Sequence, residues 1–176
     1  MGHRWPAHNA ATGELVGYHV RKDRPDGTKD MYWEDASGNP GLEGFPTKDL
    51  ALHPYQTEST GEIVVVEGEK CADALIDIGI PAVGTMCGAS VCPSGDALRL
   101  LLQYDRIVLW PDNDDAGRDH ITAIGNGLHG LGQTRIRIAR WSEAPAGGDC
   151  VNAIEAGVDI TRIISSSEAF MERRTE

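Results

Sequence analysis

From residue 62 onward, short apolar runs alternate with longer segments in which apolar residues recur every three to four positions. Buried strands are predicted by four runs rich in Val, Ile and Leu, at 62–66, 80–83, 106–110 and 135–140. Helices are predicted over 69–78, 94–103, 115–131 and 149–156, and a last strand over 161–164. Strands separated by helices imply right-handed crossovers. The pattern therefore predicts an α/β fold with a mainly parallel, four- to five-stranded sheet flanked by helices.

The first part of the chain has a different texture. Residues 13–21 alternate like an edge strand, residues 24–29 supply a turn with Pro, Asp and Gly, and residues 31–34 return to an extended pattern, which together predict a β-hairpin. Residues 37–61 are rich in Gly, Pro, Ser and Thr and predict a connecting arm. The predicted organisation is a small β-rich segment over 1–60, an α/β domain over 61–165, and a charged C-terminal tail, helical or frayed, over 166–176.

Length, charge and cysteine content exclude some classes of protein. The chain has 176 residues, enough for one well-cored domain with a small appendage, and its longest apolar run falls short of a membrane span. The net charge of −11 argues against a protein that binds nucleic acid by bulk attraction, but not against an enzyme acting on nucleotides. Four irregularly spaced cysteines and the lack of a signal-like N-terminus predict reduced thiols and a cytoplasmic protein, of a bacterial cell or phage-encoded.

Carboxylates follow two of the predicted strands directly. Glu67 ends the first run, and Asp112 and Asp114 follow the run at 106–110. Parallel strands bring such positions together at the carboxyl edge of the sheet, where open α/β folds bind ligands. Acids that meet there repel one another unless a cation lies between them, and hard divalent cations prefer oxygen ligands. The pattern therefore predicts metal-dependent phosphoryl transfer.

Each of these acids also has an ordinary explanation. Glu67 could be a carboxylate that favours the N-terminus of the following helix. Asp112 and Asp114 are spaced so that one cation can take oxygens from both, but an Asx-turn with Asn113 or Asp115 as helix cap is the alternative. We favour the metal-binding interpretation for these three acids. For Asp149, a further ligand and a helix N-cap are equally compatible with its position.

The sequence gives weaker indications for a phosphate-binding site and for histidine ligands. Arg118 could bind a phosphate or be an ordinary surface arginine, and the loop Gly84 to Ala89 could cradle a phosphate. The Walker pattern for phosphate-binding loops is absent from the sequence. The six histidines have no metal-ligand spacing and are expected to be isolated, exposed side chains.

An apolar strand ending in Glu67-Gly68, followed by Asp112-Asn113-Asp114 after another strand, resembles the Toprim domain of primases, topoisomerases and some nucleases. The residues around both motifs are most similar to those of primases of phages and mobile elements. The Arg/Lys-rich hairpin that precedes the motifs is similar to the same primases. The resemblance implies that Glu67 is a general acid/base, that Asp112 and Asp114 hold Mg²⁺ or Mn²⁺, and that Asp149 is a further metal-site acid. Asn152 stands where primases often carry another aspartate.

The resemblance implies synthesis of RNA primers on a single-stranded DNA template from nucleoside triphosphates. A zinc-binding module usually precedes this region and a helicase often follows it, so a replicative helicase or zinc-binding module is expected in the parent protein. A metal-dependent nuclease and a non-catalytic nucleotide- or metal-binding module remain as alternatives. The candidate nucleotide- or nucleic-acid-binding residues are Arg21, Lys22, Arg24, Lys29, Lys70 and Arg118.

Overall fold

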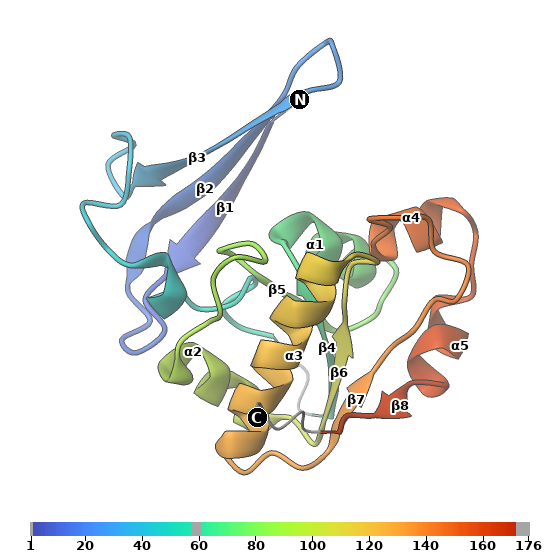
Figure 1. The fold of residues 1–176 in the computed structure, drawn as a ribbon. Coiled ribbons are helices and arrows are strands. Elements are labelled where there is room, and N and C mark those ends of the chain that lie inside the picture. The colour runs from blue at the N-terminus through green and yellow to red at the C-terminus, as the bar shows by residue number, and fades with distance from the viewer. Residues whose placement is uncertain (1, 58–60, 172–176) are drawn as a thin grey trace.

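Two sheets organise the chain, in agreement with the two textures of the sequence. The computed structural model describes residues 2–57 and 61–171. An antiparallel three-stranded sheet extends away from a helix-flanked five-stranded sheet, as Figure 1 shows. The predicted fold class is therefore confirmed.

The N-terminal sheet contains the predicted hairpin and one strand more. Strands β2 (Leu15–Asp23) and β3 (Lys29–Asp35) form the hairpin, and β1 (Gly2–His8) pairs antiparallel with β2. Strand β1 was not predicted, because Pro6 interrupts its apolar pattern. Proline lacks a backbone N–H and is tolerated on an edge strand, which is the place of β1 in this sheet. The arm that follows contains only a short 3₁₀ helix, η1 (Thr47–Asp49), among the residues that are described there.

The larger sheet has the strand order β5-β4-β6-β7-β8. Four strands are parallel: β4 (Glu62–Glu67), β5 (Ala82–Thr85), β6 (Arg106–Trp110) and β7 (Ile136–Ile138). The last, β8 (Glu168–Ala169), pairs antiparallel with β7.

Helices cover both faces of this sheet because its strands are apolar on both sides. Ile63 and Val65 of β4 face α2 (Gly95–Arg99), η2 (Leu100–Gln103) and α3 (Asp115–Gly130). Val64 and Val66 face α1 (Glu69–Asp77), α4 (Cys150–Glu155) and α5 (Ile160–Ser165). These helices lie on opposite sides of the strands in Figure 1. In the described part of the chain, none of the helices has the length and apolar character needed to cross a membrane.

The predicted strand at 161–164 is wrong, because these residues belong to α5. Ile160, Ile163 and Ile164 are buried and share one helical face, and Asp159 caps the helix by accepting a hydrogen bond from the Arg162 N–H, 3.0 Å away. The fifth strand is β8, in the segment where a helical or frayed tail was predicted. Residues 172–176 of that tail lie outside the described residues, and the domain boundaries remain a prediction.

Polar side chains tie the two sheets together at α1. Trp5 Nε1 donates to Asp73 Oδ2 (2.6 Å), and His53 Nε2 lies 2.9 Å from Asp73 Oδ1. His19 Nδ1 lies 2.6 Å from Glu69 Oε1, with only 5% of the Glu69 side chain exposed. These contacts fix the N-terminal sheet against the helix that begins at the carboxyl end of β4.

Gly84 in β5 should tolerate no side chain. A Cβ on Gly84 would lie 2.2 Å from the Gly68 carbonyl oxygen, whereas a Cβ on Gly130 would meet no described atom within 4 Å. We expect Gly84→Ala to lower the free energy of unfolding by about 1–3 kcal/mol, because backbone cannot give way as a flexible side chain can. The control, Gly130→Ala, is expected to be neutral or to raise it by up to about 1 kcal/mol. Urea unfolding followed by circular dichroism measures both, and equal stabilities of the two variants would contradict the packing.

Candidate active site

The carboxyl edge of the parallel sheet gathers the predicted acids. Glu67 is the last residue of β4, and its side chain points to the α3 side because it shares the alternation of Ile63 and Val65. Asp112 and Asp114 lie between β6 and α3, and Asp149 lies immediately before α4. Two strand ends and two helix starts thus bring four acids from distant parts of the sequence to one edge.

The charges of these acids act on one another. Burial raises the pKa of Asp112 to about 7, and the charges of Glu67, Asp149 and Asp114 add to the rise. Burial also raises the pKa of Glu67, helped by Asp114 and opposed by the backbone of Ala89. The pKa of Asp112 therefore lies in the range in which a carboxyl group can take up and release a proton near neutral pH.

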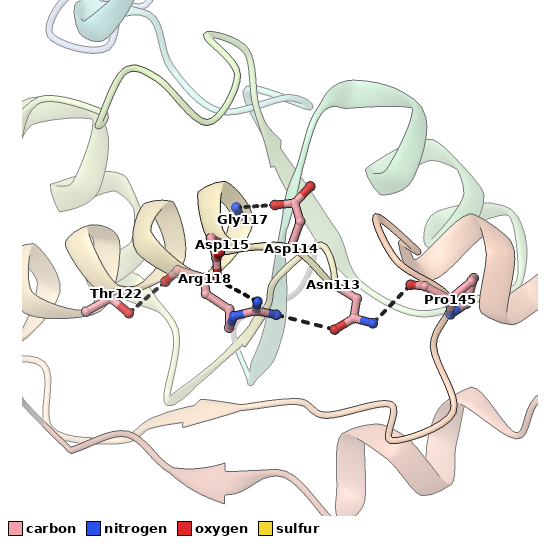
Figure 2. A network of polar contacts seen from close by, with 7 residues as sticks. All are labelled: Asn113, Asp114, Asp115, Gly117, Arg118, Thr122 and Pro145. Carbon is pink, nitrogen blue, oxygen red and sulfur yellow. Dashed lines mark hydrogen bonds and ion pairs between the residues drawn. The ribbon is translucent and has the colours of Figure 1, made fainter.

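Two of the acids cap helices. Asp114 accepts a hydrogen bond from the Gly117 N–H (2.7 Å), as Figure 2 shows, so Asp114 itself is the cap of α3, where we had considered Asn113 or Asp115. Asp149 accepts from the Asn152 N–H (2.9 Å), and the Asn152 side chain accepts from the Asp149 N–H (3.1 Å). The structure therefore contains the helix-cap arrangement for both acids, and the second oxygen of Asp149 accepts a hydrogen bond from the Cys71 thiol (3.5 Å).

The donor chemistry fits a hard divalent cation, because all four side chains offer carboxylate oxygens. Within residues 2–57 and 61–171, no group of three or more His, Cys, Asp or Glu side chains is arranged so that it could hold a metal ion. Two of the acids, Asp114 and Asp149, direct one carboxylate oxygen at a backbone N–H group. The edge supplies the ligand types but not a closed coordination shell.

A polar network holds the loop that follows β6 (Figure 2). The Asn113 side-chain amide donates to the carbonyls of Ala144 (2.8 Å) and Pro145 (3.0 Å). Arg118 pairs with Asp115 (2.8 Å) and donates to the Asn113 side-chain oxygen (3.4 Å). Arg118 is thus partly neutralised by an exposed acid, and its guanidinium remains at the surface beside the acidic edge.

A cavity of about 770 Å³ opens beside this network. It lies between α3, β7 and β8, and its lining includes Trp110, Asp112, Arg118, Ile138, Trp141 and Phe170. Its size suits a nucleoside-sized ligand.

The candidate basic residues of the hairpin divide between two faces. Residues directly opposite in the antiparallel ladder share a face, and so do residues two apart. Arg21 and Lys29 therefore lie on the face of His19 and Trp33, which contacts α1, and Lys29 is close enough to Asp112 to oppose the rise of its pKa. Lys22 lies on the other face, 5.1 Å from the Tyr32 ring.

Arg21, Arg24 and Lys70 form no hydrogen bond or ion pair with the four acids within the described part of the chain. Arg24 forms two hydrogen bonds with Asp30 (2.9 and 2.7 Å) in the hairpin turn, and Arg21 pairs with Asp23 (2.7 Å). Lys70 is an exposed residue in the first turn of α1.

The expectation of isolated, exposed histidines is wrong for three of them. His53 and His120 are buried, and His19 is paired with Glu69. Sequence reasoning also missed the role of Glu69 and Asp73 as anchors of the N-terminal sheet. Their partners lie 50 and 68 residues away in the sequence, so no local pattern could have indicated the pairs. All four cysteines are free thiols, as predicted.

No protein-family model matches the chain, and no curated protein matches it. Solved structures do. The primase fragment of the bacteriophage T7 primase-helicase protein is 20% identical, with a TM-score of 0.62 over 94% of this chain and 61% of that one. The Aquifex aeolicus primase, solved with its zinc-binding and RNA polymerase domains, is 19% identical, with a TM-score of 0.69 over 95% of this chain and 40% of that one.

A DnaG primase catalytic domain bound to single-stranded DNA is similar as well. It is 18% identical, with a TM-score of 0.66 over 94% of this chain and 53% of that one. The chain therefore has the fold of primase catalytic cores, and it spans between 40% and 61% of the length of these three structures.

The raised pKa of Asp112 predicts that the stability of the folded chain depends on pH. In the folded chain the pKa lies near 7, against an ordinary value of 3.8, so the folded state favours the protonated carboxyl and loses stability as the pH rises from about 4 to 7. We expect Asp112→Asn, in chelator-treated buffer at pH 8, to raise the free energy of unfolding on the order of 1 kcal/mol, and the gain to shrink toward pH 5.

The matched control is Asp105→Asn, which removes an exposed carboxylate just before β6, at the opposite edge of the sheet. Thermal unfolding at several pH values measures both variants. An Asp112→Asn protein no more stable than the wild type at pH 8 would contradict the crowding of carboxylates.

Proposed function

We propose that this chain is the catalytic core of a DNA primase, with a Toprim-type metal site of the kind found in phage and mobile-element primases. It would join ribonucleotides into RNA primers on single-stranded DNA. The observation that carries the proposal is the gathering of Glu67, Asp112, Asp114 and Asp149 at one sheet edge, in a fold shared with primase catalytic cores.

The proposed reaction is nucleotidyl transfer. The 3′-hydroxyl of one nucleotide attacks the α-phosphate of the next, a phosphodiester bond forms, and pyrophosphate leaves. Glu67, whose pKa burial raises, accepts the proton of the attacking hydroxyl. Asp112, Asp114 and Asp149, with Glu67, would hold Mg²⁺ or Mn²⁺, which supplies positive charge against the phosphates. The N–H groups that now bond to Asp114 and Asp149 would keep these carboxylates oriented toward the edge.

The residues around the carboxyl edge of the sheet could bind both a nucleoside triphosphate and a template strand. The cavity beside Asp112 has room for a nucleoside, and Arg118 at its rim offers a guanidinium to a phosphate. The face of the N-terminal sheet that carries Lys29 and Arg21 turns toward the acids and could receive the template strand. We also propose that the protein is cytoplasmic and that its parent carries a helicase or a zinc-binding module. The T7 fragment comes from a primase-helicase protein, and the Aquifex primase has a zinc-binding domain, which supports the second part of the proposal.

The test of this function is primer synthesis. The protein is incubated with single-stranded DNA, the four ribonucleoside triphosphates and Mg²⁺ or Mn²⁺, and dinucleotide and longer products are separated on gels. We expect products from the wild type and from Asp105→Asn, and a loss of at least about 100-fold in kcat for Glu67→Gln, because the amide cannot accept the proton.

Three other outcomes of the primer-synthesis assay would contradict parts of this proposal. Cleavage of DNA or RNA without incorporation would assign the edge to a nuclease, in which water replaces the attacking hydroxyl. Full primer synthesis by Glu67→Gln would remove the proposed role of this residue. No product from the wild type with either metal, while a longer parent protein succeeds, would exclude catalysis by this chain alone.

The two faces of the hairpin should differ in DNA binding. We expect Lys29→Ala to weaken binding of single-stranded DNA about three- to tenfold and to reduce the salt dependence by about one released ion, since Lys29 lies near the acids where the template would pass. Lys22→Ala removes the same charge from the other face and should change affinity less than about twofold. Fluorescence anisotropy at several salt concentrations measures both. Equal losses would mean that the strand does not select the face turned toward α1.

A further inference from the structure

Asn113 stands between Asp112 and Asp114, and the proposed reaction gives it no part. Its backbone joins the loop that precedes α4 through a reciprocal pair of hydrogen bonds. The Asn113 N–H donates to the Gly148 carbonyl, and the Asn113 carbonyl accepts from the Gly147 N–H, both at 2.9 Å. Two loops that are more than 30 residues apart in the sequence are therefore paired at this one residue.

The Asn113 side chain adds to this pairing. Its amide nitrogen donates to the carbonyls of Ala144 (2.8 Å) and Pro145 (3.0 Å), and its oxygen accepts from Arg118 (3.4 Å). Figure 2 shows the side chain reaching from the loop before α3 to Pro145. A carboxamide suits this place because it offers two N–H donors and an acceptor oxygen, whereas a carboxylate of the same shape could only accept.

The partners of Asn113 form the segment that leads directly to Asp149. Within residues 144–148, Asn113 bonds to Ala144, Pro145, Gly147 and Gly148. Asp149 follows this segment and caps α4 through its bonds with Asn152, in which Asn113 takes no part. The position of Asp149 along the sheet edge is therefore linked to Asn113, while its place on α4 is not.

The first turn of α3 fixes the other side of the same loop. A Cβ on Gly117 would lie 2.8 Å from the Asp112 carbonyl oxygen and 2.9 Å from the Asp112 Cβ, so the two backbones are in direct contact. The Gly117 N–H also donates to Asp114 (2.7 Å). Asp112 and Asp114 are thus held against α3, and Asn113 joins them to the loop that carries Asp149.

We propose that Asn113 is a positioning residue that holds Asp149 beside Asp112 and Asp114. By bonding the 144–148 loop through both its backbone and its side chain, it keeps the third acid at a fixed distance from the pair, so that the acids can share a cation. The inference rests on the proposed function for its metal-binding consequence, whereas the link between the loops is a property of the folded chain alone. The alternative is that Asn113 is a surface residue whose bonds do not affect the placement of Asp149.

Two substitutions and a matched control separate these explanations. Asn113→Ala removes the side-chain bonds and leaves the backbone pair. Asn113→Asp keeps the shape but turns a carboxylate oxygen toward two carbonyl oxygens, which it repels. The control is Gln133→Ala, which removes a bond of the same kind, from the Gln133 amide to the Tyr104 carbonyl (3.0 Å), at the opposite edge of the sheet.

The first measurement is amide hydrogen exchange by NMR, which requires neither metal nor substrate. We expect the Gly147 N–H to exchange at least about tenfold faster in both Asn113 variants and at the wild-type rate in Gln133→Ala, because its bond to the Asn113 carbonyl opens more often. The Asn152 N–H, which bonds to Asp149 in the α4 cap, should exchange at the wild-type rate in all three variants. This amide distinguishes a lost link from an unfolded α4.

The second measurement is Mn²⁺ affinity by electron paramagnetic resonance. We expect it to fall about tenfold in Asn113→Ala, as is typical when a group that orients a metal ligand is lost, and to change less than about twofold in Gln133→Ala. Asn113→Asp gives opposite signs for the two explanations. A carboxylate added to the edge raises the affinity if only its charge matters, whereas loss of the link lowers it, and we expect a fall of at least about threefold.

A double-mutant cycle tests whether Asn113 acts through Asp149. In Asp149→Asn the metal-binding charge is gone, but an asparagine can still cap α4. If Asn113 serves to place Asp149, Asn113→Ala should lower the Mn²⁺ affinity of the Asp149→Asn protein by less than about twofold, because the ligand that it positions is already lost.

Three results would overturn the inference. They are wild-type exchange of the Gly147 N–H in both Asn113 variants, a higher Mn²⁺ affinity in Asn113→Asp, and an undiminished effect of Asn113→Ala in the Asp149→Asn protein. A wild type that binds no Mn²⁺ would instead refute the proposed metal site, and the Gly147 exchange rates would still decide whether Asn113 holds the two loops together.

Discussion

Repulsion among carboxylates at a partly buried sheet edge is the constraint on which the rest of this structure depends. Glu67 ends β4 and Asp112 lies just beyond the end of the neighbouring strand β6, so the pairing of these two apolar strands holds the two acids close together. Burial raises the pKa values of both groups, and repulsion from the neighbouring carboxylates adds to the rise. Asp114 and Asp149 relieve part of this repulsion by capping α3 and α4, where backbone N–H groups offer partial positive charge.

Polar contacts hold the N-terminal sheet against α1, the helix that begins at the same edge. Its contacts with α1 are charged or polar and involve side chains that are largely buried, such as the His19–Glu69 pair. Leaving one partner of such a pair alone would cost more than the pair contributes, so these contacts specify one orientation. That orientation turns the hairpin face with Arg21 and Lys29 toward α1 and places Lys29 near Asp112. Binding and chemistry would then be arranged by one set of contacts.

The parallel strands and the acids that follow them could be predicted, because each depends on residues that are close together in the sequence. The apolar runs specified four parallel strands, and the carboxylates that follow two of them specified the edge where Glu67 and Asp112 meet. The last helix was mistaken for a strand since Ile160, Ile163 and Ile164 stand in a segment too short to show its period clearly. β1 was missed because Pro6 broke its pattern. The buried partners of Glu69, Asp73 and Thr85 come from distant segments, and only the folded chain brings them together.

The two borders of the larger sheet have a consequence for copies of this chain that meet in solution. An uncovered border offers N–H and C=O groups to which another molecule can add a strand, which is a route to aggregation. Beside β5 this route is obstructed by the reciprocal backbone bonds between His53 and Gly84, and beside β7 by the two residues of β8. Both borders of the larger sheet therefore leave fewer unpaired backbone groups with which another copy of the chain could form a strand pair.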